Sequence, residues 1–398
     1  MRDLIVLRNL GARQTSEPFG ERRRGEVDIS AQATSVPELR VNVETNPSKA
    51  GFRDLVRDPE VVSVAPLMPL ALIRPLESQA SAAGDASWGI AAVGADKSSF
   101  TGQGVTVAVL DTGIDSSHPA FAGVELVTRD FTGPGDGRDV AGHGTHCCGT
   151  VFGRDIDGVR IGVARGVRRA LIGKVLADNG SGSSEALFSA MTWAAENGAQ
   201  VISMSLGFDF PGLVARLTAA DWPADLATSS ALEAYRANLR MFDSLMRMLQ
   251  AREAFGSGTV VVAASGNESR RDLRPDYEIA ASLPAAAEDV ISVGAVAPGQ
   301  DGFGIGSFSN TFPQLAAPGV DIFSARVGGG LHALTGTSMA APHVAGVAAL
   351  GWEALASRSF GGVSARAVAA RLLATARPDV FGPDVDQPDR GEGLVTAP

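Results

Sequence analysis

Hydrophobic and polar positions along most of the chain form blocks that fit strands followed by helices. Continuous apolar runs predict strands buried on both faces, at residues 105–110, 170–175, 201–205, 260–264 and 290–293. Residues 184–197 carry apolar side chains at helical spacing and end at Gly198, a residue type that favours a helix C-terminus. This alternation predicts an α/β fold, a three-layer arrangement of a parallel sheet with helices on both faces. In such sheets the ligand site lies at the carboxyl ends of the strands.

The first part of the chain follows a different pattern. Short apolar runs and one brief helical segment at 48–56 predict a small α+β unit over residues 1–76. Residues 77–87 are small and polar, which is typical of an exposed linker that proteases can cut. We therefore expect an N-terminal unit at 1–76, a linker at 77–87 and a main domain at 88–398.

The segment 208–255 is longer than this plan requires. Ser230, followed three residues later by Glu233, forms a capping box and predicts the start of a strong helix. Apolar positions then form one stripe, made of Leu232, Tyr235, Leu239, Phe242, Met246 and Leu249. Two interpretations are open: a surface helix packed on the main domain, or a lid or docking element beside the ligand site.

Composition limits the classes of function. With 34 Lys and Arg against 44 Asp and Glu, the 398-residue chain has a formal net charge of −10, which argues against a nucleic-acid partner. The 2 cysteines, Cys147 and Cys148, are adjacent and cannot form a disulfide framework. The apolar run at 4–7 is too short for a secretory signal, and no run is long enough for a membrane span. We expect no membrane partner, and a cytoplasmic protein unless a leader has been removed, in which case it is secreted.

Three polar residues occupy positions suited to chemistry. Asp111 directly follows the first predicted strand of the main domain, so it lies at a carboxyl end. His143 lies between Gly142 and Gly144, which leave one face of the imidazole open. Ser338 begins a helix of small residues, where free N–H groups stabilise a developing anion. Carboxylate, imidazole and hydroxyl together are the groups that nucleophilic catalysis by serine requires.

The order Asp, His, Ser and the sequences around these residues resemble those of subtilisin-family serine proteases, the subtilases of peptidase family S8. The matching segments are DTGIDSSHP from Asp111, HGTHCCGTV from His143, ISMSLG from Ile202, AASGNES from Ala263 and GTSMAAPHVAG from Gly336. The resemblance covers residues 88–395 and implies a serine endopeptidase that works through an acyl-enzyme. His143 would be the general base for Ser338, and Asp111 would orient His143. Asn267 and the Ser338 N–H would form the oxyanion hole.

The resemblance also implies a substrate cleft for a peptide or protein bound in extended conformation, as an added strand. The strand edges that would bind it are Gly180, Ser181 and Gly182 on one side and Ser205, Leu206 and Gly207 on the other. The walls of the S1 pocket would be Ala264, Ser265 and Gly266, with Ser282 at the floor. A serine at the floor makes a shallower pocket than glycine would.

The N-terminal unit resembles the family's inhibitory propeptide, through the segment DPEVVSV at 58–64. This implies a ferredoxin-like unit that acts as a partner in cis, leaves its tail in the cleft and is removed by self-cleavage within 77–87. The alternative is a catalytically silent scaffold with the subtilase fold, which binds peptide or protein partners through the helix at 232–249.

Calcium is less well supported. Many subtilases bind Ca²⁺ through an Asp where this chain has Ala120, and through a loop that here contains Asp155 and Asp157 between Arg154 and Arg160. A hard cation needs six to eight oxygen ligands, so we expect no required cofactor and regard Asp155 and Asp157 as weak metal candidates. Cys147, one helical turn after His143, is either a buried apolar residue or a thiol whose modification disturbs His143.

Overall fold

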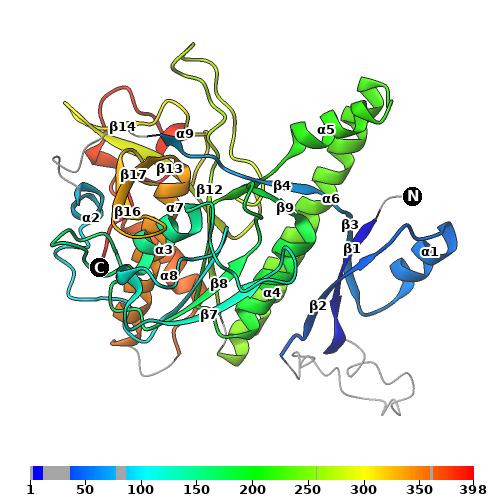
Figure 1. The fold of residues 1–398 in the computed structure, drawn as a ribbon, viewed down its shortest axis with the longest axis horizontal. Helices are drawn as coiled ribbons and strands as arrows, with labels where there is room; N and C mark the ends of the chain where they lie inside the picture. Colours follow the sequence, from blue (N-terminus) through cyan, green and yellow to red (C-terminus); the bar gives the residue numbers. More distant parts are fainter. Residues whose placement is uncertain (1–2, 12–35, 78–86, 257, 359–361) are drawn as a thin grey trace, which may run out of the picture.

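The computed structural model describes the chain except for residues 1–2, 12–35, 78–86, 257 and 359–361 (Figure 1). The N-terminal unit contains an antiparallel sheet in the order β2-β1-β3, made of β1 (Leu4–Asn9), β2 (Leu39–Glu44) and β3 (Val61–Pro66). Helix α1 (Lys49–Arg57) begins at Ser48, whose hydroxyl accepts from Gly51 N at 3.0 Å. The predicted small α+β unit is confirmed.

The main domain is built on one large sheet in the order β14-β13-β12-β10-β6-β8-β7, with β15 also paired to β13. Its strands are β6 (Thr106–Asp111), β7 (Glu125–Asp130), β8 (Arg169–Lys174), β10 (Val201–Met204), β12 (Val260–Ala264), β13 (Val290–Gly299), β14 (Gly302–Ile305) and β15 (Leu315–Pro318). The pairs are parallel except β13 with β14. All the apolar runs predicted as strands lie in this sheet, which confirms the α/β fold.

Helices cover both faces of the sheet. On one face lie α3 (His143–Phe152), α7 (Thr337–Ala356) and α8 (Ala365–Ala374), and on the other lie α4 (Ser184–Glu196) and α6 (Ala224–Ala251). Strand β6 shows the alternation: Val107 and Val109 pack toward α3 and α7, whereas Ala108 and Leu110 pack toward α4 and α6. Burial on both faces explains why the strand is a continuous apolar run.

The N-terminal unit packs on the α4 and α6 face of the main domain. Its buried side chains Ile5, Leu7 and Leu39 belong to the same apolar cluster as those of the two helices. Figure 1 shows α6 as the long helix that runs beside the three N-terminal strands. On this helix Asn238, fully buried, donates from Nδ2 to Pro66 O at 2.9 Å. The unit and the main domain therefore share one hydrophobic core.

The segment 208–255 contains α5 (Phe210–Ala219), α6 and a short 3₁₀ turn, η3 (Arg252–Phe255). The predicted helix start at Ser230 is wrong, because α6 begins at Ala224 after Pro223 and Ser230 lies inside it. The stripe is also partly wrong: Leu232 is 48% exposed, and the buried face near it is formed by Ala227, Ala231, Ala234 and Asn238. Small side chains on this face let strand β3 approach the helix, which a stripe of large residues would prevent.

The end of the N-terminal unit pairs with strands of the main domain in two small sheets. One has the order β11-β4-β9 and the other β16-β17-β5. Their strands are β4 (Pro69–Leu72), β5 (Leu76–Glu77), β9 (Ser181–Ser183), β11 (Leu206–Phe208), β16 (Ile322–Ala325) and β17 (Leu331–Thr335). The remaining short helices are α2 (Trp88–Ala92), η2 (Pro119–Phe121), η4 (Pro378–Val380) and α9 (Gln387–Arg390).

No helix among the described residues has the length and apolar character that crossing a membrane requires. The strand β5 includes Glu77, so the first residue of the predicted linker is paired with β17. The rest of that linker, apart from Ser87, lies outside the described residues.

Candidate active site

The structure brings Asp111, His143 and Ser338 to one edge of the sheet from three elements. Asp111 ends β6, His143 is the first residue of α3, and Ser338 is in the first turn of α7. His143 Nδ1 lies 2.8 Å from Asp111 Oδ1. The side chains of all three are buried, with at most 3% exposed. Burial strengthens the electrostatic interaction within the Asp111–His143 pair, because water does not screen it.

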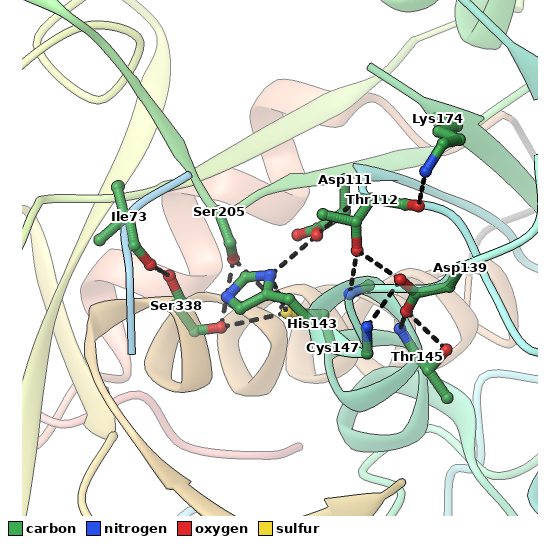
Figure 2. A network of polar contacts seen from close by, with 12 residues as sticks. Ile73, Asp111, Thr112, Asp139, His143, Thr145, Cys147, Lys174, Ser205 and Ser338 are labelled. Atoms are coloured by element: carbon green, nitrogen blue, oxygen red, sulfur yellow. Dashed lines mark hydrogen bonds and ion pairs between the residues drawn. The ribbon is translucent and has the colours of Figure 1, made fainter. Parts of the chain in front are cut away.

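The nucleophile candidate contacts the chain's own N-terminal segment. Ser338 Oγ donates to Ile73 O at 2.9 Å (Figure 2). Among the described residues His143 Nε2 has no hydrogen-bond partner, although it is buried. The serine hydroxyl is therefore bonded to a peptide carbonyl rather than to the imidazole.

Asn267 lies beside this contact. Its Nδ2 donates to Arg74 O at 3.0 Å, while its Oδ1 accepts from the N and Oγ1 of Thr337 at 2.9 and 2.8 Å. A Cβ at Gly336 would lie 2.9 Å from Asn267 Nδ2, so a side chain there would press on the amide. The two bonds from Thr337 orient the amide so that its N–H₂ group faces the peptide backbone.

The segment 69–72 forms the middle strand between the two predicted substrate edges. Strand β4 pairs antiparallel with β11, opposing Ala71 to Gly207, and antiparallel with β9, opposing Leu70 to Gly182. In addition, Leu72 N donates to Gly180 O at 2.8 Å. An extended peptide therefore fills the cleft between β9 and β11 as an added strand.

The side chain of Ile73, which is 4% exposed, lies near residues predicted to form the S1 pocket. It packs in the same apolar cluster as Ala264. A Cβ at Gly207 would lie 3.7 Å from Ile73 Cγ1 and 3.6 Å from Ser282 Oγ, so Ile73 and Ser282 both border Gly207. Ser265 is fully buried, and Gly266, at φ +117°, donates its N–H to Thr337 Oγ1 at 3.2 Å. A β-branched side chain therefore lies beside the residues predicted for this pocket.

Ser205 directly precedes β11, the strand that pairs with β4. Its Oγ donates to Ser338 O at 3.1 Å, beneath the nucleophile. Cys147 joins the same contact, with Sγ 3.4 Å from Ser338 O and 3.8 Å from His143 Nδ1. Burial, reinforced by the Asp111 charge, raises the pKa of the Cys147 thiol well above its usual value, so the thiol is protonated. Asp111, His143 and Cys147 have potential metal-ligand atoms within 4.8 Å of one another, but Asp111 and His143 belong to the candidate triad.

A second group of polar residues supports the Asp111–His143 pair: Thr112, Asp139, Thr145 and Lys174 (Figure 2). The sequence points to Asp139, four residues before His143, as a residue that shapes the cleft, but it does not assign the other three to the site. One signal could have identified Lys174, because it ends the apolar run of β8 as Asp111 ends that of β6, so both lie at carboxyl strand ends. Thr145 carries no such signal, and the bond between Asp139 and Thr112 is visible only in the fold.

Three of the other four histidines bond to backbone carbonyls through a ring nitrogen. His118 lies with Nε2 2.9 Å from Gly330 O, and His146 with Nε2 2.9 Å from Ile322 O. His343 Nδ1 lies 2.8 Å from Met339 O, and burial lowers the pKa of His343 to about 4. At neutral pH this ring is therefore uncharged. It is buried and bonds to the preceding turn of its own helix, α7.

The loop considered for calcium does not fit a hard-cation site. The guanidinium of Arg154 donates to the carbonyls of Phe152, Arg165 and Val167, which are therefore already bonded to a cationic group. Asp155 is 3.2 Å from the guanidinium of Arg165, at the surface. Calcium needs carbonyl and carboxylate oxygens as ligands. In this loop those oxygens are bonded to the guanidinium groups of Arg154 and Arg165.

Comparison with known proteins agrees with this geometry. A family model described as the subtilase family matches residues 102–394. Similar curated proteins include "Subtilisin-like protease 1" of Trichophyton equinum and of Trichophyton tonsurans, each 33% identical over 315 residues, which are 75% of this chain and 52% of the relative. The protein of the same description from Arthroderma benhamiae is 32% identical, covering 75% of this chain and 66% of its own.

The chain thus spans about half the length of the curated relatives it matches first. The family model, however, matches most of the main domain, including the segments that carry Asp111, His143 and Ser338. The fold, the edge-of-sheet position of these residues and the family match lead to one conclusion: the chain belongs to the subtilase family of serine proteases.

Proposed function

We propose that the chain is a serine endopeptidase, made as a self-inhibited precursor that cleaves itself between Ile73 and Arg74. Its substrates are peptides or proteins that bind in extended conformation. The N-terminal unit is the inhibitor in cis. The observation that carries this proposal is the position of the Ile73 carbonyl, whose oxygen accepts from Ser338 Oγ at 2.9 Å while the preceding residues fill the cleft.

The chemistry follows from the groups around this bond. Ser338 Oγ gives its proton to His143 Nε2 and forms a bond to the Ile73 carbonyl carbon. The resulting oxyanion is stabilised by Asn267 Nδ2 and by the Ser338 N–H, since the first N–H groups of a helix have no partner within it. The proton then passes to Arg74 N as the peptide bond breaks. Water, activated by the same imidazole, releases the acyl group.

The contacts also explain why the precursor would be inhibited. The proton of Ser338 Oγ is directed at Ile73 O, and Asn267 Nδ2 is bonded to Arg74 O, one residue beyond the bond to be cut. Attack requires that the hydroxyl turn to His143 and that Asn267 move to the Ile73 oxygen. Until both changes occur, the segment blocks the site without being cleaved.

The position proposed for cleavage differs from the linker at 77–87 that the sequence favours. Glu77 lies beyond Ser338, in strand β5, and residues 78–86 lie outside the described part of the chain. The contacts support cleavage of the Ile73–Arg74 bond inside the cleft instead. The N-terminal segment is held on both sides of Ser338, because β4 pairs with β11 before it and β5 pairs with β17 after it.

The test compares the purified wild-type chain with Ser338→Ala by intact mass and N-terminal sequencing. We expect the wild type to yield a new N-terminus at Arg74 and a fragment that ends at Ile73. Ser338→Ala should stay intact, because the nucleophile is missing. Ser357→Ala is a matched control at the exposed end of the same helix, and it should process normally.

A fluorophosphonate probe distinguishes the enzyme from a silent scaffold. After processing and dilution that releases the cleaved N-terminal unit, an active triad reacts through Ser338, whereas a scaffold that only binds peptides stays unlabelled. Cleavage of the Ser338→Ala chain at the same bond would contradict self-processing, and a wild-type new N-terminus elsewhere would contradict the Ile73–Arg74 assignment.

A further inference from the structure

A buried carboxylate lies between the two elements that carry Asp111 and His143. Asp139 is 1% exposed and stands in the loop before α3. We propose that Asp139 is a positioning residue for the triad, which joins the end of β6 to the first turn of the His143 helix. This inference rests on the proposed peptidase function and adds a residue to it.

Both oxygens of Asp139 are saturated with donors (Figure 2). Oδ1 accepts from Thr112 Oγ1 at 2.9 Å and from Gly142 N at 2.8 Å. Oδ2 accepts from Thr145 N at 2.8 Å and from Thr145 Oγ1 at 2.7 Å. An ionised carboxylate can accept all of these bonds, whereas an amide would point its N–H₂ group at donors and lose the bonds on one side. Replacement by asparagine therefore breaks the arrangement without changing its size.

Thr112 connects Asp139 to Asp111. Its N–H donates at 2.7 Å to Asp111 Oδ1, the same oxygen that lies 2.8 Å from His143 Nδ1. Its carbonyl accepts from the buried Lys174 Nζ at 2.7 Å, and its hydroxyl donates to Asp139. The backbone beside Asp111 is thus held at its N–H, its carbonyl and its side chain. A displacement of the Asp139 side chain is therefore transmitted to the Asp111 carboxylate through Thr112 alone.

The other bonds of Asp139 reach His143 from both sides. Gly142 precedes His143 and adopts φ +90°, and Thr145 follows it by two residues in the first turn of α3. The helix has no capping side chain of its own at Gly142, so Asp139 supplies the acceptor for a first-turn N–H and a negative charge at the positive end of the helix. The direction in which the His143 ring leaves the helix depends on this turn.

The substrate cleft does not depend on these contacts. The peptide is held by β9 and β11, and Asp139 bonds to neither strand in the described part of the chain. Loss of Asp139 should therefore affect the chemical step and leave peptide binding intact. This separation distinguishes a positioning role from a general loss of folding.

The experiment expresses the full chain, allows it to process, and releases the cleaved N-terminal unit by dilution. It then measures kcat and KM on a fluorogenic peptide, with rates expressed per active site by fluorophosphonate titration. For Asp139→Asn we expect kcat to fall about 10- to 100-fold, the cost of a small misplacement of catalytic groups, with KM changed less than about 2-fold. Thr112→Val should lose a similar factor, because it removes the hydroxyl at nearly constant size. Thr112→Ser, which keeps the hydroxyl, should restore kcat.

Asp130→Asn is the matched control, since Asp130, at the end of β7, bonds in a similar way to Thr132 but through hydrogen bonds that are exposed. It should leave kcat unchanged. A spectroscopic readout completes the test: the low-field proton between His143 Nδ1 and Asp111 should be seen in the wild type and in Thr112→Ser, and should shift or broaden in Asp139→Asn and Thr112→Val.

Two results would overturn the inference. One is an active wild type whose kcat per active site is unaffected by Asp139→Asn and Thr112→Val. The other is a fall in the number of active sites alone, with kcat, KM and the low-field proton unchanged, which would show a purely structural role. A wild type that hydrolyses no peptide after processing and release of the cleaved N-terminal unit would instead overturn the proposed function, and this inference with it.

Discussion

The segment 67–77 is held very differently on the two sides of the Ile73–Arg74 bond. Before the bond, β4 is paired on both edges, and the side chains of Leu70 and Ile73 are 1% and 4% exposed. After the bond, β5 is paired on one edge only, and Leu76 is 45% exposed. Met68 adds two more bonds on the first side, one to and one from Ser184. Nearly all the apolar burial of the segment therefore precedes the bond.

This asymmetry has a consequence for the product of self-cleavage. Under the proposed self-cleavage, strand pairing and apolar burial would keep the fragment that ends at Ile73 in the cleft, since neither depends on the peptide bond that breaks. The new N-terminus at Arg74 has few contacts and can leave. The difference between the two sides predicts that the cleaved N-terminal unit remains a tight inhibitor, and each experiment below tests one part of that statement.

The largest effect is expected on the rate of self-cleavage, from a change at Asn267, which lies beside the Ile73–Arg74 bond. Asn267→Ala removes the side-chain donor of the oxyanion hole, so the rate of self-cleavage should fall about 100- to 1000-fold, the range quoted for the equivalent asparagine of subtilisin itself. Time courses of intact mass measure this rate. The inhibited fold should persist, because Arg74 O loses only one bond. An unchanged rate would mean that Asn267 serves only to hold Arg74.

A smaller effect is expected before the bond, from Leu70→Ala. Truncating this buried leucine costs about 2 kcal/mol or more, which corresponds to inhibition by the cleaved unit weakened about 30-fold or more. The measurement is peptidase activity of the processed protein over a dilution series, from which the inhibition constant follows. If the constant matched that of the wild type, apolar burial would not be what retains the fragment.

After the bond, Leu76→Ala is the matched control and should change the inhibition constant by less than about 3-fold. The leucine is half exposed, so its truncation removes little buried area. The same dilution series measures it. If Leu76→Ala changed the inhibition constant as much as Leu70→Ala, the residues before and after the Ile73–Arg74 bond would not differ in how they retain the cleaved unit.

Much of this fold is predictable from local signals in the sequence. Each strand of the central sheet that is buried on both faces leaves a continuous apolar run, as β6 and β12 do. Asp111 and Ser338 are found by the same logic, one at the end of such a run and the other at the start of a helix. In these cases the residue and the element that positions it are neighbours in the chain.

The features that the sequence does not reveal are those formed by residues far apart in the chain. Strand β4 is short and begins with a proline, so it gains strand structure only because β9 and β11 lie on either side. For the same reason the sequence predicts cleavage in the polar linker at 77–87, whereas the contacts of β4 support the proposed bond Ile73–Arg74. The place of Asp139 four residues before His143 indicates the cleft, but its bond to Thr112 spans 27 residues and leaves no sequence signal.

The smallest effect is expected from removing divalent cations. If calcium held this domain together, chelation would loosen both sides of the cleft and abolish their difference. We propose that Arg154 takes that role in its loop, so excess EDTA should change neither the self-cleavage rate nor the Tm. Arg154→Gln should lower the free energy of unfolding by about 1–3 kcal/mol, because the carbonyls of Arg165 and Val167 lose their donor.

Arg165→Gln is the matched control for this last change, since its side chain is 45% exposed and its ion pair with Asp155 lies at the surface. It should cost less than about 1 kcal/mol. Denaturant unfolding of the uncleaved Ser338→Ala chain measures both variants without interference from proteolysis. A fall in Tm on adding EDTA that calcium reverses would contradict the role given to Arg154. The retention of the cleaved unit would then have to be measured again with calcium present, because a bound cation would support both sides equally.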